Sequence, residues 1–224
     1  MKGTMIILLA LFTFSLIPLF ADTVENTAMA AETNENTIKA DLAVGTIGAA
    51  KTVSKDMPID NELCPVMLGN KVKPGLNVVS DGRIINVCCE GCVKTLKEDA
   101  YPHLKNFVYE KDGVKFILKE YLKSRIDTNE LTVLDVLAPE QFQIEHIKGA
   151  VNLPLDSIET LAATILPKKD AKIIVYCMGY ICGSSTVAFR NLVKLGYTNV
   201  MDYKGGTSEW KQYYPELVVT EPKK

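Results

Sequence analysis

The sequence predicts a protein of mixed α and β structure, and two stretches carry that prediction. In one, the apolar run Ile173–Tyr176, typical of a buried strand, leads through a short loop into a helix. In the other, the short strands Leu76–Val79 and Ile84–Val87 flank Asp81-Gly82, which is a strong hairpin signal. With 224 residues, the chain is long enough to form two compact units.

The loop after the first of these strands places a thiol at the start of a helix. Cys177 directly follows the strand, so peptide N–H groups of the loop and of the first helical turn are expected to point toward its sulfur. With the helix dipole, such a position can lower a cysteine pKa from about 8.5 to about 3.5–7.5. A thiolate nucleophile is the leading interpretation, and a core cysteine is the alternative.

The chain from about Phe116 to Leu217 resembles the rhodanese-like sulfurtransferases, because several separate motifs occur in that family's order. These motifs are Leu131-Thr132-Val133-Leu134-Asp135-Val136, His146-Ile147-Lys148-Gly149-Ala150-Val151-Asn152-Leu153-Pro154, the Cys177 loop, Leu195-Gly196-Tyr197, and Tyr203-Lys204-Gly205-Gly206 followed by Trp210. The resemblance implies an α/β fold in which helices flank a central parallel sheet, with the catalytic loop at a strand's carboxyl end. It also implies a sulfurtransferase that carries sulfane sulfur as a persulfide on Cys177. His146 is interpreted as structural.

The rest of the loop is expected to contact the substrate. Its candidate substrate-binding residues are Met178, Gly179, Tyr180, Ile181, Gly183, Ser184 and Ser185. Cys182, five residues after Cys177, is a candidate auxiliary catalytic thiol that releases sulfur from the persulfide by forming a loop disulfide. The alternative for Cys182 is a small apolar filler.

Departures from the family pattern bear on the substrate. Leu137 and Gln141 stand where the family usually has Arg and Glu, and Cys182 occupies a slot that often holds Arg. No residue of the loop is charged, so persulfide or polysulfide donors fit at least as well as thiosulfate. Gly183 stands where related phosphatases need an Arg to clamp phosphoryl oxygens, which argues against phosphatase activity.

The other four cysteines lie in a second module, about residues 61–109. A tight turn holds Cys64, while Cys88 and Cys92 lie four residues apart at a helix start and can face the same side. Three thiolates can therefore converge on one soft metal ion. The module resembles the small treble-clef-like, cysteine-rich metal-binding domains called TRASH or YHS-like, which implies a thiophilic ion such as zinc or copper.

The fourth ligand of this metal site stays open. The candidates are Cys89, His103, Met67 and water. Disulfides are the main alternative to a metal, because exported proteins normally oxidise paired thiols, and a redox-active thiol group is a third interpretation. In the disulfide interpretation, Cys64 can pair with either Cys88 or Cys92.

The amino terminus has the pattern of a secretion signal. One positive charge in residues 1–4 precedes a nearly continuous apolar run over residues 5–20. We expect a signal peptide over residues 1–21, with cleavage as late as residue 30, and a periplasmic or otherwise exported protein; an uncleaved anchor is the alternative. A flexible tether over 22–57, a metal-binding domain over 58–112 and a rhodanese-like domain over 113–224 complete the expected organisation.

Composition limits the partners. A formal net charge of −2 offers no basic surface for nucleic acid or anionic lipid. The expected partners are a small sulfane-sulfur donor and a thiol acceptor, with no nucleic acid and no membrane after signal cleavage; a protein partner stays unidentified. Two functions follow: an exported sulfurtransferase fused to a metal-binding module, or a heavy-metal binding or detoxification protein in which the rhodanese-like domain is accessory. The retained nucleophile favours the first.

Overall fold

The computed structural model describes residues 57–220. The expected signal peptide lies outside the described residues, and so does the expected tether apart from residue 57. Across residues 57–220, no helix combines the length and the apolar character needed to cross a bilayer.

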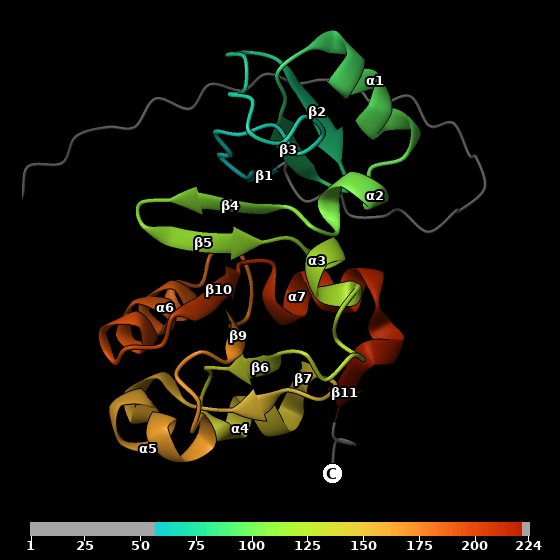
Figure 1. Ribbon diagram of the computed structural model, residues 1–224. Helices are drawn as coiled ribbons and strands as arrows, with labels where there is room; N and C mark the ends of the chain where they lie inside the picture. Colours follow the sequence, from blue (N-terminus) through green and yellow to red (C-terminus); the bar gives the residue numbers. More distant parts are fainter. Residues whose placement is uncertain (1–56, 221–224) are drawn as a thin grey trace, which may run out of the picture. The chain divides into compact units, whose positions relative to one another are not determined.

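The cysteine-rich module is built on a small three-stranded sheet (Figure 1). The predicted hairpin is confirmed, since two antiparallel strands turn at Asp81-Gly82, where both residues have positive φ. Its elements are β1 (Met57–Pro58), β2 (Asn77–Ser80), β3 (Arg83–Asn86), α1 (Glu90–Glu98) and α2 (Tyr101–Leu104), with the strands in the order β1-β3-β2. Cys64 and Cys92 are buried in its core beside Ile85, Leu96 and Leu104.

The rest of the described chain contains a six-stranded sheet in the order β4-β5-β10-β9-β6-β8. These strands are β4 (Val108–Lys111), β5 (Val114–Ile117), β6 (Thr132–Asp135), β8 (Val151–Asn152), β9 (Lys172–Tyr176) and β10 (Asn199–Tyr203). The predicted α/β class is confirmed, with one correction: the sheet is mixed, because the edge strand β4 pairs antiparallel with β5. The turn at Asp112-Gly113, with φ of 52° and 73°, reverses the chain there. This hairpin spans the expected domain boundary at 112/113.

Helices cover both faces of that sheet. The remaining elements of this part of the chain are the helices α3 (Lys119–Lys123), α4 (Pro139–Ile144), α5 (Ile158–Ile165), α6 (Ser184–Lys194) and α7 (Gly206–Tyr213), and the 3-10 turns η1 (Leu155–Ser157) and η2 (Pro215–Leu217). The strands β7 (Glu145–Ile147) and β11 (Val218–Thr220) form a separate antiparallel pair.

Side-chain alternation along β9 decides where the sulfur of Cys177 lies. Ile173 and Val175 pack into a core with residues of α5 and α6, whereas Ile174 and Tyr176 pack into a second core with residues of α3 and α7. Cys177 continues the first set. Its side chain therefore belongs to the face on which α6 begins.

Candidate functional site

Helix α7 holds the backbone of the cysteine loop from one side. The N–H of Thr207 donates to the carbonyl of Cys177 at 3.1 Å, and the N–H of Ser208 donates to the carbonyl of Met178 at 2.9 Å. Gly206 has a φ of +55°, and a Cβ at this position would lie 2.3 Å from the Cys177 carbonyl oxygen. Only glycine permits this close approach of the helix to the loop.

The thiol of Cys177 is enclosed by the loop that follows it. Its side chain is 1% exposed, and its sulfur lies 3.5 Å from the hydroxyl oxygen of Ser185 and 3.5 Å from the carbonyl oxygen of Cys182. The thiol donates to the hydroxyl oxygen of Ser185, and the hydroxyl and N–H of this residue, in the first turn of α6, both lower the pKa of Cys177. The structure thus places Cys177, Cys182 and Ser185 together, as the sequence suggested.

The resting ionisation of the two loop thiols differs from the expectation. Burial raises the pKa of Cys177, and the neighbouring Cys182 raises it further, beyond what the hydrogen bonds from Ser185 offset. Burial also opposes ionisation of Cys182, but hydrogen bonds from Cys177, from Ser184 and from the N–H of Met178 lower its pKa. The N–H groups that were expected to surround the sulfur of Cys177 are divided between the sulfurs of Cys177 and Cys182. When both thiols are reduced, Cys177 is therefore the less acidic of the two.

The candidate substrate-binding residues do not all face one cavity. Met178, Gly179, Tyr180 and Ile181 line a cleft of about 340 Å³ on the outer side of the loop, where Ile181 is 97% exposed. Gly183 and Ser184 lie on the other side, at the start of α6 and beside Cys182. The cleft also receives residues of the cysteine-rich hairpin, which sequence reasoning did not place there: Asp81, Gly82 and Arg83.

Two charged residues at the end of β10 also escaped prediction. Lys204 donates from Nζ to the carbonyl of Cys182 at 3.1 Å, so a cation lies beside a loop that has no charge of its own. Asp202 is fully buried; it accepts a hydrogen bond from Thr186 at 2.7 Å and interacts with the hydroxyl of Ser185. Burial raises the pKa of Asp202. The only sequence signal was their place in or next to the Tyr203-Lys204-Gly205-Gly206 motif.

Three sulfurs of the cysteine-rich module converge. The sulfur atoms of Cys64, Cys88 and Cys92 lie within 4.8 Å of one another, and Cys64 and Cys92 are buried. The Cys64 turn is closed by its N–H, which donates to the carbonyl of Asn70 at 2.8 Å. Burial disfavours ionisation of Cys64, but N–H groups of Met67, Cys88 and Val66 point at its sulfur and lower its pKa. This donor set fits a soft metal ion.

The candidate fourth ligands differ in position. Cys89, at the N-cap of α1, has its sulfur 3.2 Å from that of Cys92 and so lies next to the three-cysteine group. Met67 is 48% exposed on the turn, and His103 is half-buried in α2, outside the converging group. All six cysteines are free thiols in the structure.

The carboxyl-terminal part of the chain is similar in sequence to known proteins. The sequence profile of the rhodanese-like domain matches residues 118–213. Thiosulfate sulfurtransferase PspE from Escherichia coli K12 is 39% identical over 72 residues, which cover 32% of this chain and 67% of that protein. A solved structure described as a rhodanese with anions from E. coli is 37% identical, covers 35% of this chain and 88% of its own, and has a TM-score of 0.32.

A longer relative is similar over a smaller share of its length. Adenylyltransferase and sulfurtransferase UBA4 from Meyerozyma guilliermondii is 34% identical over 92 residues, or 38% of this chain. The match covers 21% of that relative, so this chain spans about a fifth of it.

Proposed function

Because the chain belongs, through residues 118–213, to the rhodanese-like domain family, we propose that it is a sulfurtransferase that carries sulfane sulfur on Cys177. The observation that carries the proposal is the loop itself, in which Cys177 follows a strand, contacts Ser185 and Cys182, and is braced by α7. The reaction is nucleophilic transfer through a covalent enzyme intermediate.

In the first half-reaction, the ionised sulfur of Cys177 attacks the outer sulfur of a persulfide or polysulfide donor. The donor's S–S bond breaks, its inner sulfur leaves as a thiolate, and a persulfide forms on Cys177. The hydroxyl and N–H of Ser185 stabilise negative charge on the sulfur they contact. The ammonium of Lys204, held on the Cys182 carbonyl, supports approach of an anionic donor, including thiosulfate.

In the second half-reaction, sulfur leaves by one of two routes. An acceptor thiolate attacks the outer sulfur, forms a new persulfide and returns Cys177 to its thiolate. Alternatively, the thiolate of Cys182 attacks the inner sulfur, the loop disulfide forms and hydrosulfide departs. Two equivalents of an external thiol then reduce that disulfide and are themselves oxidised to a disulfide. The contact between the two loop thiols supports the second route.

Mass spectrometry of the purified protein tests this function. After incubation with a sulfane donor, the peptide containing Cys177 should gain one sulfur, and Cys177→Ser should gain none. Sulfur transfer by Cys177→Ser at the native rate would remove the enzymatic assignment.

A specific observation supports a second function for the small module. The convergence of Cys64, Cys88 and Cys92 supports binding of one thiophilic ion, zinc or copper, with Cys89 the nearest further sulfur. In the alternative whole-protein function, this module binds or detoxifies heavy metal and the rhodanese-like domain is accessory. Elemental analysis with intact-mass measurement, with and without reductant, distinguishes metal, disulfide and persulfide in one sample.

We also propose that the protein is exported. The charged start and the apolar run over residues 5–20 support this localisation. Amino-terminal sequencing should find a mature start near Asp22 or Ala31, and recovery of Met1 in a membrane fraction would support an anchor instead.

A further inference from the structure

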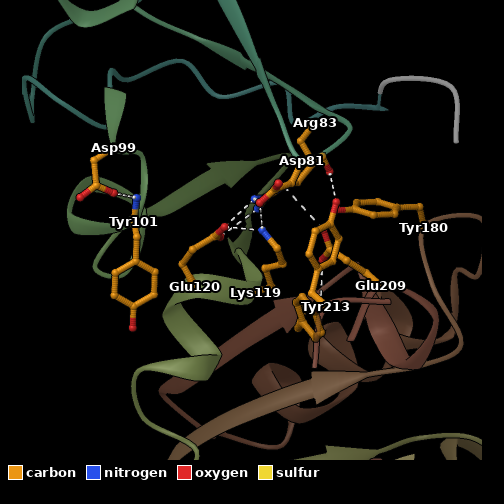
Figure 2. Close-up of polar contacts among 10 residues, drawn as sticks. Asp81, Arg83, Asp99, Tyr101, Lys119, Glu120, Tyr180, Glu209 and Tyr213 are labelled. Carbon is orange, nitrogen blue, oxygen red and sulfur yellow. Dashed lines mark hydrogen bonds and ion pairs between the residues drawn. The ribbon is translucent and has the colours of Figure 1, made fainter. Parts of the chain in front are cut away.

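A buried cluster of charges joins the hairpin of the cysteine-rich module to the rhodanese-like domain (Figure 2). Arg83, the first residue of β3, is 1% exposed. Its two terminal nitrogens donate to the two carboxylate oxygens of Glu120 on α3, at 3.0 and 2.6 Å. Lys119 completes this side of the cluster by donating to Asp81 at 2.7 Å and to Glu120. This half of the cluster is a contact between two modules.

The other half of the cluster reaches the cysteine loop. Nε of Arg83 lies 3.6 Å from a carboxylate oxygen of Glu209 on α7. The same oxygen accepts a hydrogen bond from the hydroxyl of Tyr180 at 3.2 Å, and the other oxygen accepts one from Tyr203 at 2.8 Å. Tyr180 lies only three residues after Cys177 in the loop. A cation of one module is thus connected to the catalytic loop of the other through one carboxylate.

Glu209 depends on this cation because it is itself buried. Its side chain is 7% exposed, and within residues 57–220 its ion pair is with Arg83. A buried carboxylate that loses its counter-charge is left uncompensated and is no longer held in place by an ion pair. Loss of that ion pair therefore weakens the positioning of Tyr180, whose hydroxyl donates to the same carboxylate. Glu120, in contrast, keeps Lys119 as a second cation.

We infer that Arg83 is a positioning residue for the proposed sulfur transfer: through Glu209 it holds Tyr180, and with Tyr180 it shapes the cleft beside Cys177. The inference rests on the proposed function. It explains why the cleft of about 340 Å³ has Arg83 and Asp81 in one wall and Met178 and Tyr180 in the other. In this chain, the hairpin of the cysteine-rich module therefore supplies one wall of that cleft.

The test compares Arg83→Met with Lys119→Met in the full-length protein. Both variants remove a buried cation from the same cluster, but Lys119→Met leaves Arg83 paired with Glu120 and Glu209. Two rates are measured per folded molecule: persulfide formation on Cys177 with a sulfane donor, and alkylation of Cys177 by iodoacetamide across pH, each resolved by peptide mass spectrometry.

We expect Arg83→Met to slow persulfide formation by about tenfold and to change the rate of Cys177 alkylation, because Tyr180 in the same loop is no longer held through Glu209. Tyr180→Phe should cause a similar loss, and the double variant should lose no more than Arg83→Met alone, because both act through one link. Lys119→Met should keep the native rate. Equal rates in Arg83→Met and Lys119→Met, or additive losses in the double variant, would overturn the inference.

A second variant covers the case in which Arg83→Met does not fold. Arg83→Lys keeps the charge but cannot bind Glu120 bidentately and reach Glu209 at the same time. It should therefore slow persulfide formation while the melting temperature stays near that of Lys119→Met; a native rate would contradict the inference. If the native protein formed no persulfide, the proposed function would fail, while the alkylation profiles would still decide the role of Arg83.

Discussion

The hydroxyl oxygen of Ser185 lies 3.5 Å from the sulfur of Cys177. Ser185 also interacts with the buried carboxyl of Asp202, which a hydrogen bond from Thr186 holds in place. The thiol is therefore in contact with a hydroxyl at the start of α6, and the buried carboxyl of Asp202 accepts a hydrogen bond from the next residue of that helix, Thr186. This arrangement places hydrogen-bonding groups on a sulfur that is otherwise surrounded by apolar side chains.

Removal of that hydroxyl should make Cys177 a poorer nucleophile. Hydrogen bonds from Ser185 lower the pKa of Cys177 against the effect of burial. In Ser185→Ala, alkylation of Cys177 at neutral pH should slow by about tenfold, since a hydrogen bond to a charged group contributes about 1.5 kcal/mol. Ser208→Ala is the matched control, because it truncates a hydroxyl in the cleft and leaves the N–H that binds Met178. Equal rates in both variants would contradict the role of Ser185.

Replacement of the second loop thiol should have two effects. Cys182 raises the pKa of Cys177, because a thiolate disfavours a second negative charge beside it. In Cys182→Ser the pKa of Cys177 should fall, and alkylation near neutral pH should become several-fold faster. The persulfide on Cys177 should also persist longer and release sulfide more slowly. If the persulfide lifetime and the rate of sulfide release were both unchanged, Cys182 would serve only as a small apolar side chain that fills its position in the loop.

Metal removal should loosen the small module. With Cys64, Cys88 and Cys92 as ligands, the protein should bind one thiophilic ion, and a chelator should increase hydrogen exchange over residues 61–107 because so small a core depends on the site. Cys64→Ser should lose the ion, while Cys182→Ser should retain it. Hydrogen-exchange protection that the chelator leaves unchanged, together with a disulfide mapped to Cys64, would show that a disulfide and not a metal ion stabilises this module.

Acid stability should depend on Glu120. Burial opposes its ionisation, but hydrogen bonding and charge from Arg83 lower its pKa from 4.5 to about 2. Because the folded value lies below the unfolded one, this carboxylate stabilises the fold above pH 4.5, by at most about 3 kcal/mol, and the contribution is lost as pH falls toward 2. The melting-temperature difference between the native protein and Glu120→Gln should therefore shrink across that range. A melting-temperature difference that stays constant as the pH falls from 4.5 to 2 would contradict this contribution of Glu120 to stability.

The parts of the site that depend on local sequence could be predicted. The strand before Cys177 and the hairpin at Asp81-Gly82 follow from short-range patterns, and the structure contains both. The convergence of Cys64 with Cys88 and Cys92 was expected from the residue type and the placement of Cys64 on a turn, and the three sulfurs lie within 4.8 Å of one another.

Contacts between distant segments could not be predicted in the same way. The pair Arg83–Glu209 joins residues 126 positions apart, and in sequence each residue is one charge among many. The ionisation of Cys177 depends on which sulfur receives each N–H group, which only the folded loop decides. The antiparallel strand β4 was missed because its exposed residues have no apolar pattern.

The central claim is that Cys177 carries sulfane sulfur, and peptide mass spectrometry after exposure to a sulfane donor tests it most directly. The account predicts a gain of one sulfur on the Cys177 peptide of the native protein, removed by a thiol acceptor and absent from Cys177→Ser. An unmodified Cys177 peptide, with sulfur transfer still proceeding at the native rate in Cys177→Ser, would contradict it.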